Sequence, residues 1–460
     1  MKRRISLLLL AVMLVCLCVP ASAAQWFGME ESINGNGREI DHIKYVTAAN
    51  DVEALVIASE GGVPNYSIRA DFFGLPVVEI MRAAFSCNWY LERISIPNTI
   101  RRIGDAAFQD CKNLKSVTLP SSVTELGEYA FAGSGLTSLT IPSTLQSAGQ
   151  FAFNCCRQLQ SVKVESGSFQ TVGPYLFCEC DRLRTADLAP TVTTISNRAF
   201  ENCPALQTVR APGVQKIWDR AFFDDKNLRS IVLSADLLYV GPAAFQLCEG
   251  LTDVYYAGTQ EQWNAIDIRE RNEPLLNANI HFNSSMGEFA DLEFGGYYLD
   301  AVDWALAKGV TNGMGGGRFA PGDTCTRAQV VTFLWRAMDM PEPKAADPGF
   351  QDVPADSYYA KAVAWAVENN ITNGMGDGRF APGAACTRGQ VVTFLWRARR
   401  MPAAGTANPF HDVTAGAYYH DAVLWAVAQG VTNGIDADHF APDAACTRAQ
   451  VVTFLYRDQK

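Results

Sequence analysis

Residues 103–120, with the sequence IGDAAFQDCKNLKSVTLP, decide the fold of the first half of the chain. Ile103 and Phe108 lie five residues apart, Leu114 follows six residues later, and the segment ends in the alternating run KSVTLP. Alternation of polar and apolar residues predicts a short strand with one face inward. So short a unit cannot bury its own apolar face, and we expect it to pack against further copies of itself.

The same pattern occurs eight times between residues 77 and 256. The repeats place a phenylalanine every 22 to 24 residues: Phe85, Phe108, Phe131, Phe153, Phe177, Phe200, Phe222 and Phe245. Each follows a small or apolar residue by five positions and precedes a leucine by five or six. This periodicity predicts a solenoid of stacked coils over residues 77–285, including a C-terminal cap, after an N-terminal segment and cap at residues 24–76.

These motifs resemble the BspA-type leucine-rich repeats, whose pattern joins A-F to a cysteine, a leucine and a terminal I-x-I-P. The resemblance implies a solenoid of short strands, of mixed α/β class. It also implies a surface interaction protein, because some members of that family are adhesins. It does not identify the partner.

Five cysteines each follow a repeat phenylalanine by three residues: Cys111, Cys156, Cys180, Cys203 and Cys248. Strands roughly 4.8 Å apart would permit disulfides between neighbouring coils. However, Cys156, Cys180 and Cys203 occupy three successive coils, so at most two of them could pair. Buried free thiols that act as small apolar groups explain all five positions, and we favour that interpretation.

From Phe289 onward a longer period begins. The motif Phe289-Ala-Asp291 recurs as Phe350-Gln-Asp352 and Phe410-His-Asp412, at offsets of 61 and 60 residues. Each unit has one helix with an apolar stripe, a Thr-Asn-Gly turn and a second helix that starts at a threonine. Thr326 and Gln329 form a capping box in the first unit. Capping leaves the arginine after each threonine free at the positive end of a helix dipole, where it can bind an anion. These arginines are Arg327, Arg388 and Arg448. The alternative is that they are ordinary solvated side chains.

This arrangement closely resembles three S-layer homology domains, over residues 286–341, 347–402 and 407–460. The resemblance implies an all-α pseudo-trimer whose grooves bind secondary cell-wall polysaccharide bearing pyruvate ketals. It assigns the carboxylate contact to the three arginines and close backbone approach to Gly313, Gly374 and Gly434. Trp304, Trp365 and Trp425 either line a groove or pack between units. The chain departs from the family at Gln329, Gln390 and Gln450 in place of Glu, at Gly389 in place of Ala, and at residues 435–439, IDADH in place of MGDGR. The last departure suggests that the grooves differ in affinity.

The first residues indicate export. Basic residues 2–4, an apolar run over 7–19 and Ala21-Ser22-Ala23 predict a signal peptide at residues 1–23, with a retained membrane anchor as the alternative. No other segment is expected to span a membrane. The formal net charge of −10 argues against nucleic acid. Neither a nucleophile elbow nor a zincin motif occurs, and we expect no enzyme, cofactor or metal site.

The sequence therefore predicts a secreted cell-wall protein, adhesin-like in function. The alternative is a structural S-layer component that self-assembles. One outward strand position varies along the repeats, and we place possible partner contacts there, at Lys163, Asp187, Arg210 and Tyr255. Unconstrained variation of exposed residues is the competing explanation.

Overall fold

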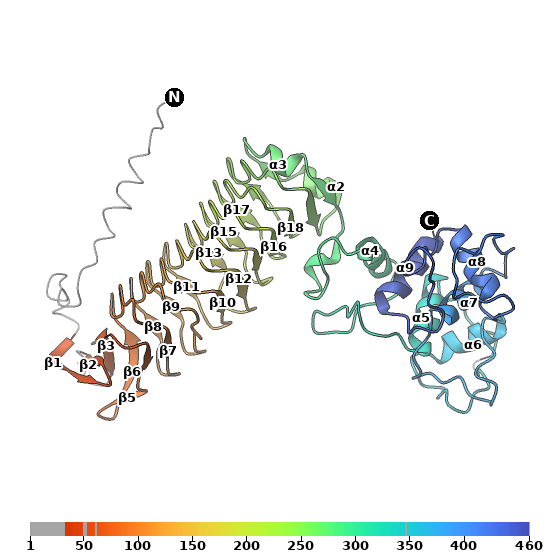
Figure 1. The fold of residues 1–460 in the computed structure, drawn as a ribbon, viewed down its shortest axis with the longest axis horizontal. Helices are drawn as coiled ribbons and strands as arrows, with labels where there is room; N and C mark the ends of the chain where they lie inside the picture. Colours follow the sequence, from red (N-terminus) through yellow and green to blue (C-terminus); the bar gives the residue numbers. More distant parts are fainter. Residues whose placement is uncertain (1–32, 49–52, 60–61, 346, 460) are drawn as a thin grey trace. The chain divides into compact units, whose positions relative to one another are not determined.

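The computed structural model describes residues 33–48, 53–59, 62–345 and 347–459. The chain divides into two compact units, Met1–Gly287 and Glu288–Lys460 (Figure 1). The predicted signal peptide lies outside the described residues. Within the described part, no helix is both long enough and apolar enough to cross a membrane.

The first unit is a solenoid whose strands pair mostly in parallel, coil upon coil (Figure 1). One sheet has the order β1 (Ile33–Ile40), β2 (Ile43–Ala48), β3 (Ala54–Ser59), β6 (Leu75–Ile80), β8 (Arg102–Ile103), β9 (Glu125–Leu126) and β11 (Ser147–Ala148), with β5 (Asp71–Phe72) paired to β6. A second continues with β13 (Thr171–Val172), β15 (Thr194–Ile195), β17 (Lys216–Ile217), β19 (Tyr239–Val240) and β21 (Asp267–Ile268).

The third sheet has the order β10 (Ser138–Ile141), β12 (Ser161–Val164), β14 (Thr185–Asp187), β16 (Thr208–Ala211), β18 (Ser230–Leu233), β20 (Asp253–Tyr256) and β22 (Asn279–His281). A small sheet joins β4 (Asn65–Ser67) to β7 (Arg93–Ser95). The short helices α2 (Gln260–Asn264) and α3 (Glu273–Leu276) lie at the end of the array, followed by the 3₁₀ helix η3 (Ser285–Gly287).

The repeat phenylalanines form one continuous column inside the solenoid. All eight are fully buried, and the rings of Phe108 and Phe131 stack with centroids 4.9 Å apart. Even the widest step, from Phe153 to Phe177, is 5.6 Å. The predicted solenoid is therefore confirmed, because each coil buries its phenylalanine against the coils on both sides.

Two turns around each phenylalanine have left-handed backbone. Around Phe108 these are Ala106, at φ 52°, and Asp110, at φ 56°. The turns lie over one another, and the Phe108 N–H donates to the Ala130 carbonyl of the next coil at 2.7 Å. Hydrogen bonds between coils thus satisfy backbone groups that no helix or sheet ladder would satisfy.

The eleven cysteines of the described residues are free. In the solenoid, the Cys111 thiol donates to the Phe85 carbonyl at 3.0 Å, and Cys203 donates to Phe177 at 3.1 Å. Burial raises the pKa of the Cys156 thiol to about 12. These thiols therefore act as neutral donors inside the core.

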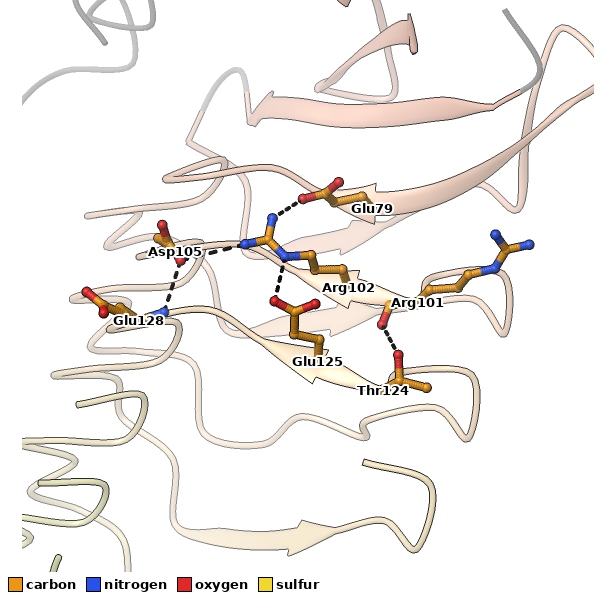
Figure 2. Close-up of polar contacts among 7 residues, drawn as sticks. All are labelled: Glu79, Arg101, Arg102, Asp105, Thr124, Glu125 and Glu128. Carbon is orange, nitrogen blue, oxygen red and sulfur yellow. Dashed lines mark hydrogen bonds and ion pairs between the residues drawn. The ribbon is translucent and has the colours of Figure 1, made fainter. Parts of the chain in front are cut away.

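Charged residues on neighbouring coils form a polar cluster on the first sheet (Figure 2). Arg102 on β8 contacts Glu79 on β6, and its Nε donates to Glu125 Oε1 on β9 at 3.1 Å. Asp105 accepts from the Glu128 N–H at 3.0 Å. Exposed ion pairs contribute only about 0–1 kcal/mol each, so this cluster adds little to the stability of the fold.

The second unit holds the helices α4 (Leu299–Ala307), α5 (Arg327–Ala337), α6 (Ala360–Glu368), α7 (Arg388–Ala398), α8 (His420–Ala428) and α9 (Arg448–Gln459). The expectation that this unit is all-α is not confirmed. Helices make up only part of it, and extended segments before the second helix of each repeat form isolated β-bridges. These bridges are Thr324 to Thr447, Thr326 to Ala385 and Thr387 to Ala445.

Three cysteine backbones close the three helical repeats into a ring. The N–H of Cys325 donates to the Cys446 carbonyl at 2.9 Å, Cys386 donates to Cys325 at 2.9 Å, and Cys446 donates to Cys386 at 2.8 Å. Helices α5, α7 and α9 contact one another, while α4 packs on α9, α6 on α5 and α8 on α7. The first repeat therefore packs directly against the third.

Candidate anion-binding arginine sites

Each second helix of the ring begins with the predicted capping box. Thr326 Oγ1 accepts from the Gln329 N–H at 3.2 Å, and Gln329 Oε1 accepts from the Thr326 N–H at 3.0 Å. The second and third repeats form the same pair of bonds. Glutamine thus performs the capping that the family pattern assigns to glutamate.

The arginine that follows each cap is buried. Arg327 and Arg388 are 3% exposed and Arg448 is 2% exposed, so the alternative that they are ordinary solvated side chains is wrong. Each Nε donates to a phenylalanine carbonyl of the next repeat in the ring: Arg327 to Phe380 at 2.9 Å, Arg388 to Phe440 at 2.8 Å and Arg448 to Phe319 at 2.8 Å. The guanidinium of Arg327 also lies over the rings of Phe380 and Phe394.

Part of the hydrogen-bonding capacity of these guanidinium groups is unmet. Nη2 of Arg327 and Nη2 of Arg388 are buried without a partner among the described residues. In the third site, Arg448 Nη2 donates to Thr311 Oγ1 at 3.2 Å. Burial lowers the pKa of all three arginines, yet a guanidinium remains charged at neutral pH. A buried charged donor without a partner is costly, and an anionic acceptor would satisfy it.

Each site also has a tyrosine from the repeat that supplies neither the arginine nor the carbonyl. Tyr418 lies within electrostatic reach of Arg327, Tyr297 of Arg388 and Tyr358 of Arg448. These tyrosines are 56–61% exposed and pack edge-on against the tyrosine that follows each of them. An arginine from one repeat, a carbonyl from the next and a tyrosine from the remaining one therefore make up each arginine site.

These tyrosines were not among the site residues predicted from the sequence, although their pattern carries a signal. The pair Tyr297-Tyr298 recurs as Tyr358-Tyr359 and Tyr418-Tyr419, immediately before the first helix of each repeat. The sequence pattern assigns no role to the first tyrosine of each pair.

An aspartate two residues after the first phenylalanine of each repeat holds the turn whose phenylalanine carbonyl accepts from a site arginine. Asp291 accepts from the N–H of Phe319 at 2.9 Å and from the N–H of Ala320 at 2.7 Å. Asp352 and Asp412 form the equivalent pairs. Burial raises the pKa of Asp352, but these backbone donors outweigh it and lower the pKa below its usual value. The carboxylates thus fix the carbonyls to which the arginines donate.

The predicted glycines serve the fold of their own units. At Gly313, φ is +78°, and a Cβ atom would lie 2.5 Å from Cε1 of Phe289. Gly374 and Gly434 approach Phe350 and Phe410 in the same way. In each repeat this close backbone approach is made to an aromatic ring of the same repeat, and an approach of these glycines to a ligand remains a prediction.

The tryptophans lie at helix packing contacts. Trp365 and Trp425 are 7% and 4% exposed, and Trp304 packs on Tyr456 with ring centroids 5.9 Å apart. Of the two alternatives left open by the sequence, packing is therefore the one that burial favours. A ligand contact by these side chains remains only a prediction.

The variable stripe of the solenoid is partly covered by the chain itself. Tyr255 is 5% exposed and stacks on His281 at 4.5 Å, so its expected exposure as a partner contact is wrong. The half-buried Arg210 donates from Nη1 to the Met286 carbonyl of η3 at 2.7 Å. Lys163 is exposed and Asp187 is half-buried. A partner contact by these two side chains remains a prediction.

Comparison with known families agrees with this architecture. The family described as BspA type Leucine rich repeat region matches in six copies, over residues 78–207 and 166–266. The S-layer homology domain matches residues 289–331, 349–392 and 409–452. The chain carries BspA-type leucine-rich repeats followed by three S-layer homology domains. Leucine-rich-repeat and S-layer homology families are typically found in surface proteins without catalytic activity.

The proteins to which this chain is similar include surface-layer proteins. The Surface-layer 125 kDa protein of Lysinibacillus sphaericus is 32% identical over 166 residues, 35% of this chain and 14% of that protein. The S-layer protein of Bacillus thuringiensis subsp. finitimus is 25% identical over 175 residues, 37% of this chain and 21% of that protein. The chain thus spans about a fifth or less of these two relatives. The domains and relatives indicate a secreted cell-surface protein associated with the S-layer.

One enzyme and one solved structure are also similar. Exoglucanase XynX of Acetivibrio thermocellus is 24% identical over 163 residues, 34% of this chain and 15% of the enzyme, through shared anchoring domains. The crystal structure of a T. pallidum leucine-rich repeat protein is 24% identical, with a TM-score of 0.39, covering 46% of this chain and 90% of that chain.

Proposed function

We propose that the three S-layer homology domains anchor this protein non-covalently to an anionic secondary cell-wall polysaccharide that bears pyruvate ketals. The anchored solenoid then serves as an adhesin-like interaction module, without catalytic activity. The observation that carries the proposal is the pair of buried arginine donors, Nη2 of Arg327 and of Arg388, that lack a partner among the residues the structure describes.

The chemistry of the arginine sites fits such a ligand. A pyruvate ketal presents a carboxylate, and charge-assisted hydrogen bonds to one contribute about 1.5–3 kcal/mol each. The N-terminus of α5, α7 or α9 adds a favourable dipole for the same charge. The exposed tyrosine beside each arginine supplies an apolar wall for a sugar ring. Three such sites on one chain raise the overall affinity for a repeating polymer.

The proposal is tested with the full chain and cell walls that retain their polysaccharide. The triple variant Arg327→Ala, Arg388→Ala and Arg448→Ala is expected to lose co-sedimentation with these walls. Because the arginines are buried, the triple variant Tyr297→Ala, Tyr358→Ala and Tyr418→Ala tests the same sites at exposed residues, and we expect binding to fall at least tenfold.

Two controls make this test specific. Arg157→Ala, at an exposed residue of the solenoid, should bind like the parent. Walls from which the ketals have been removed by mild acid should bind the parent poorly. Undiminished binding by the folded tyrosine variant, or equal binding to stripped walls, would contradict the proposal.

A structural role in the S-layer is the second candidate, favoured by the S-layer proteins among the relatives. A lattice former should assemble into sheets or large oligomers as its concentration rises. An adhesin-like protein should remain monomeric over the same range in analytical ultracentrifugation.

A further inference from the structure

The three arginine sites differ in the loop that leads to the acceptor carbonyl. Residues 314–318 read MGGGR, residues 375–379 read MGDGR and residues 435–439 read IDADH. The first loop therefore carries one positive charge, the second carries one of each sign, and the third carries two negative charges when its histidine is neutral. Arg318, Arg379 and His439 directly precede the phenylalanines whose carbonyls accept from Arg448, Arg327 and Arg388.

At each site, the last residue of the loop and the site arginine have the same carboxylate as a neighbour. Arg318 Nε lies 3.8 Å from Asp291 Oδ2, and Asp291 also acts electrostatically on Arg448. In the second repeat, Asp352 is influenced by Arg379 and influences Arg327. In the third, Asp412 acts on both His439 and Arg388. The fifth residue of each loop, Arg318, Arg379 or His439, is thus close enough to change the electrostatic potential that a bound anion would meet.

Acidic groups surround the histidine of the third loop. His439 Nδ1 lies 3.0 Å from Asp436 Oδ1 and 3.6 Å from Asp438 Oδ1, and Asp412 is the further charged neighbour. Asp436 Oδ1 also accepts from the backbone N–H groups of Asp438 and His439. All three loop side chains are exposed. The hydrogen bond to Asp436 raises the pKa of His439 above its usual value.

We propose that the three sites are not equivalent, and that the Arg388 site binds the anionic wall glycan as strongly as the other two only when His439 is protonated. The Arg327 and Arg448 sites hold it at neutral pH with Arg379 and Arg318 as second cations. This inference rests on the proposed function. Its physical cause is the repulsion between the ligand carboxylate and Asp436 and Asp438, which protonated His439 offsets.

Full-length variants with a single remaining arginine test the inference. Each double Arg→Ala variant retains Arg327, Arg388 or Arg448 alone, and its binding to cell walls with pyruvylated polysaccharide is measured at pH 7.5 and 5.5. The Arg388-only protein is expected to bind about tenfold more weakly than the other two at pH 7.5, a modest effect of screened charges. At pH 5.5 it should recover most of that difference, while the other two change less than twofold.

A loop exchange supplies the matched control. Replacing residues 435–439 by MGDGR in the Arg388-only protein should restore binding at pH 7.5 and remove its pH dependence. Conversely, Arg318→His with Arg379→His in the parent, at exposed loop residues, should make the parent's binding pH-dependent. This second experiment remains decisive if a double arginine variant fails to fold.

The possible outcomes separate the inference from the proposed function. Equal binding by the Arg388-only protein at pH 7.5, or no pH effect from the two histidine substitutions, would overturn the inference while the anchor stands. Failure of the parent itself to bind pyruvylated walls at either pH would instead reject the proposed function and the inference together.

Discussion

The solenoid and the helical unit both consist of repeats, but they close their contacts in opposite ways. In the solenoid, Phe131 stacks on Phe108 and Phe153, the phenylalanines of the coils before and after it. In the helical unit, Arg448 of the last repeat donates to Phe319 of the first, 129 residues away. A coil in a linear stack needs only the coils on either side of it, whereas a closed ring forms only when all three repeats are present.

The difference also decides which substitutions each region tolerates. Along the cysteine column of the solenoid, Asn88, Ser134 and Asp225 replace cysteine, and each finds its own partners. Ser134 Oγ contacts Cys156 Sγ at 3.4 Å, and Asn88 Nδ2 donates to the Tyr66 hydroxyl at 3.1 Å. In the ring, the threonine cap, arginine and glutamine are the same in all three repeats. Because the three repeats meet at one centre, equivalent positions in them vary less than equivalent positions of the solenoid.

Removing one repeat from each region gives the largest expected effect. Deleting residues 154–177 joins Phe153 to Cys178 in the same relation as Phe177 to Cys178, and it should leave a shorter, folded solenoid. We expect its free energy of unfolding to fall by a few kcal/mol, because one interface between neighbours is lost. Deleting residues 403–460 should instead abolish cooperative unfolding of the remaining two helical repeats.

Differential scanning calorimetry of the two deletions checks this contrast. The parent should show separate transitions for the solenoid and the helical unit. A sharp helical transition that survives the loss of the third repeat would show that closure of the ring is not required.

A glycine substitution in the ring gives a smaller effect. Gly313→Ala places a Cβ atom 2.5 Å from Phe289 Cε1 at φ +78°, and we expect the helical unit to lose about 2–3 kcal/mol. Gly315→Ala is the matched control, since its φ is +81° and nothing lies within 4 Å of its Cβ position. It should cost only about 1 kcal/mol of backbone strain. Chemical denaturation that gave equal losses would count against the close contact with Phe289.

The smallest expected effect is a gain in the solenoid. Asp225 is fully buried, its Oδ1 accepts from the Cys203 N–H at 2.7 Å, and its Oδ2 has no partner among the described residues. Burial raises the pKa of this carboxyl well above its usual value. The folded state therefore binds the proton more tightly than the unfolded chain. Its contribution to stability is complete below the unfolded pKa and is lost as the pH rises toward the folded one.

Asp225→Asn retains the acceptor for Cys203 and cannot ionise. We expect it to stabilise the solenoid by about 1–2 kcal/mol at pH 7 and by less at pH 4. Asp236→Asn, at an exposed carboxyl, is the control. A stabilisation that does not depend on pH would show that the charge of Asp225 is not its cause.

Local and neighbouring contacts are what the sequence by itself determined. The spacing of 22 to 24 residues identified the phenylalanine column, because each ring meets the ring one period away. The Thr326 and Gln329 pair identified a capping box, because both residues lie within one helical turn. Both family assignments followed from such short-range patterns.

Contacts between distant repeats were decided only by the tertiary structure. No local pattern indicated that Arg327 would be buried against Phe380, that Tyr418 would join it from the third repeat, or that His281 would stack on Tyr255. Periodicity reports the partners one turn or one repeat away, and it carries no signal for the direction in which a set of repeats closes. The burial of a charged side chain is therefore set by ring closure, which brings together residues that no local pattern relates.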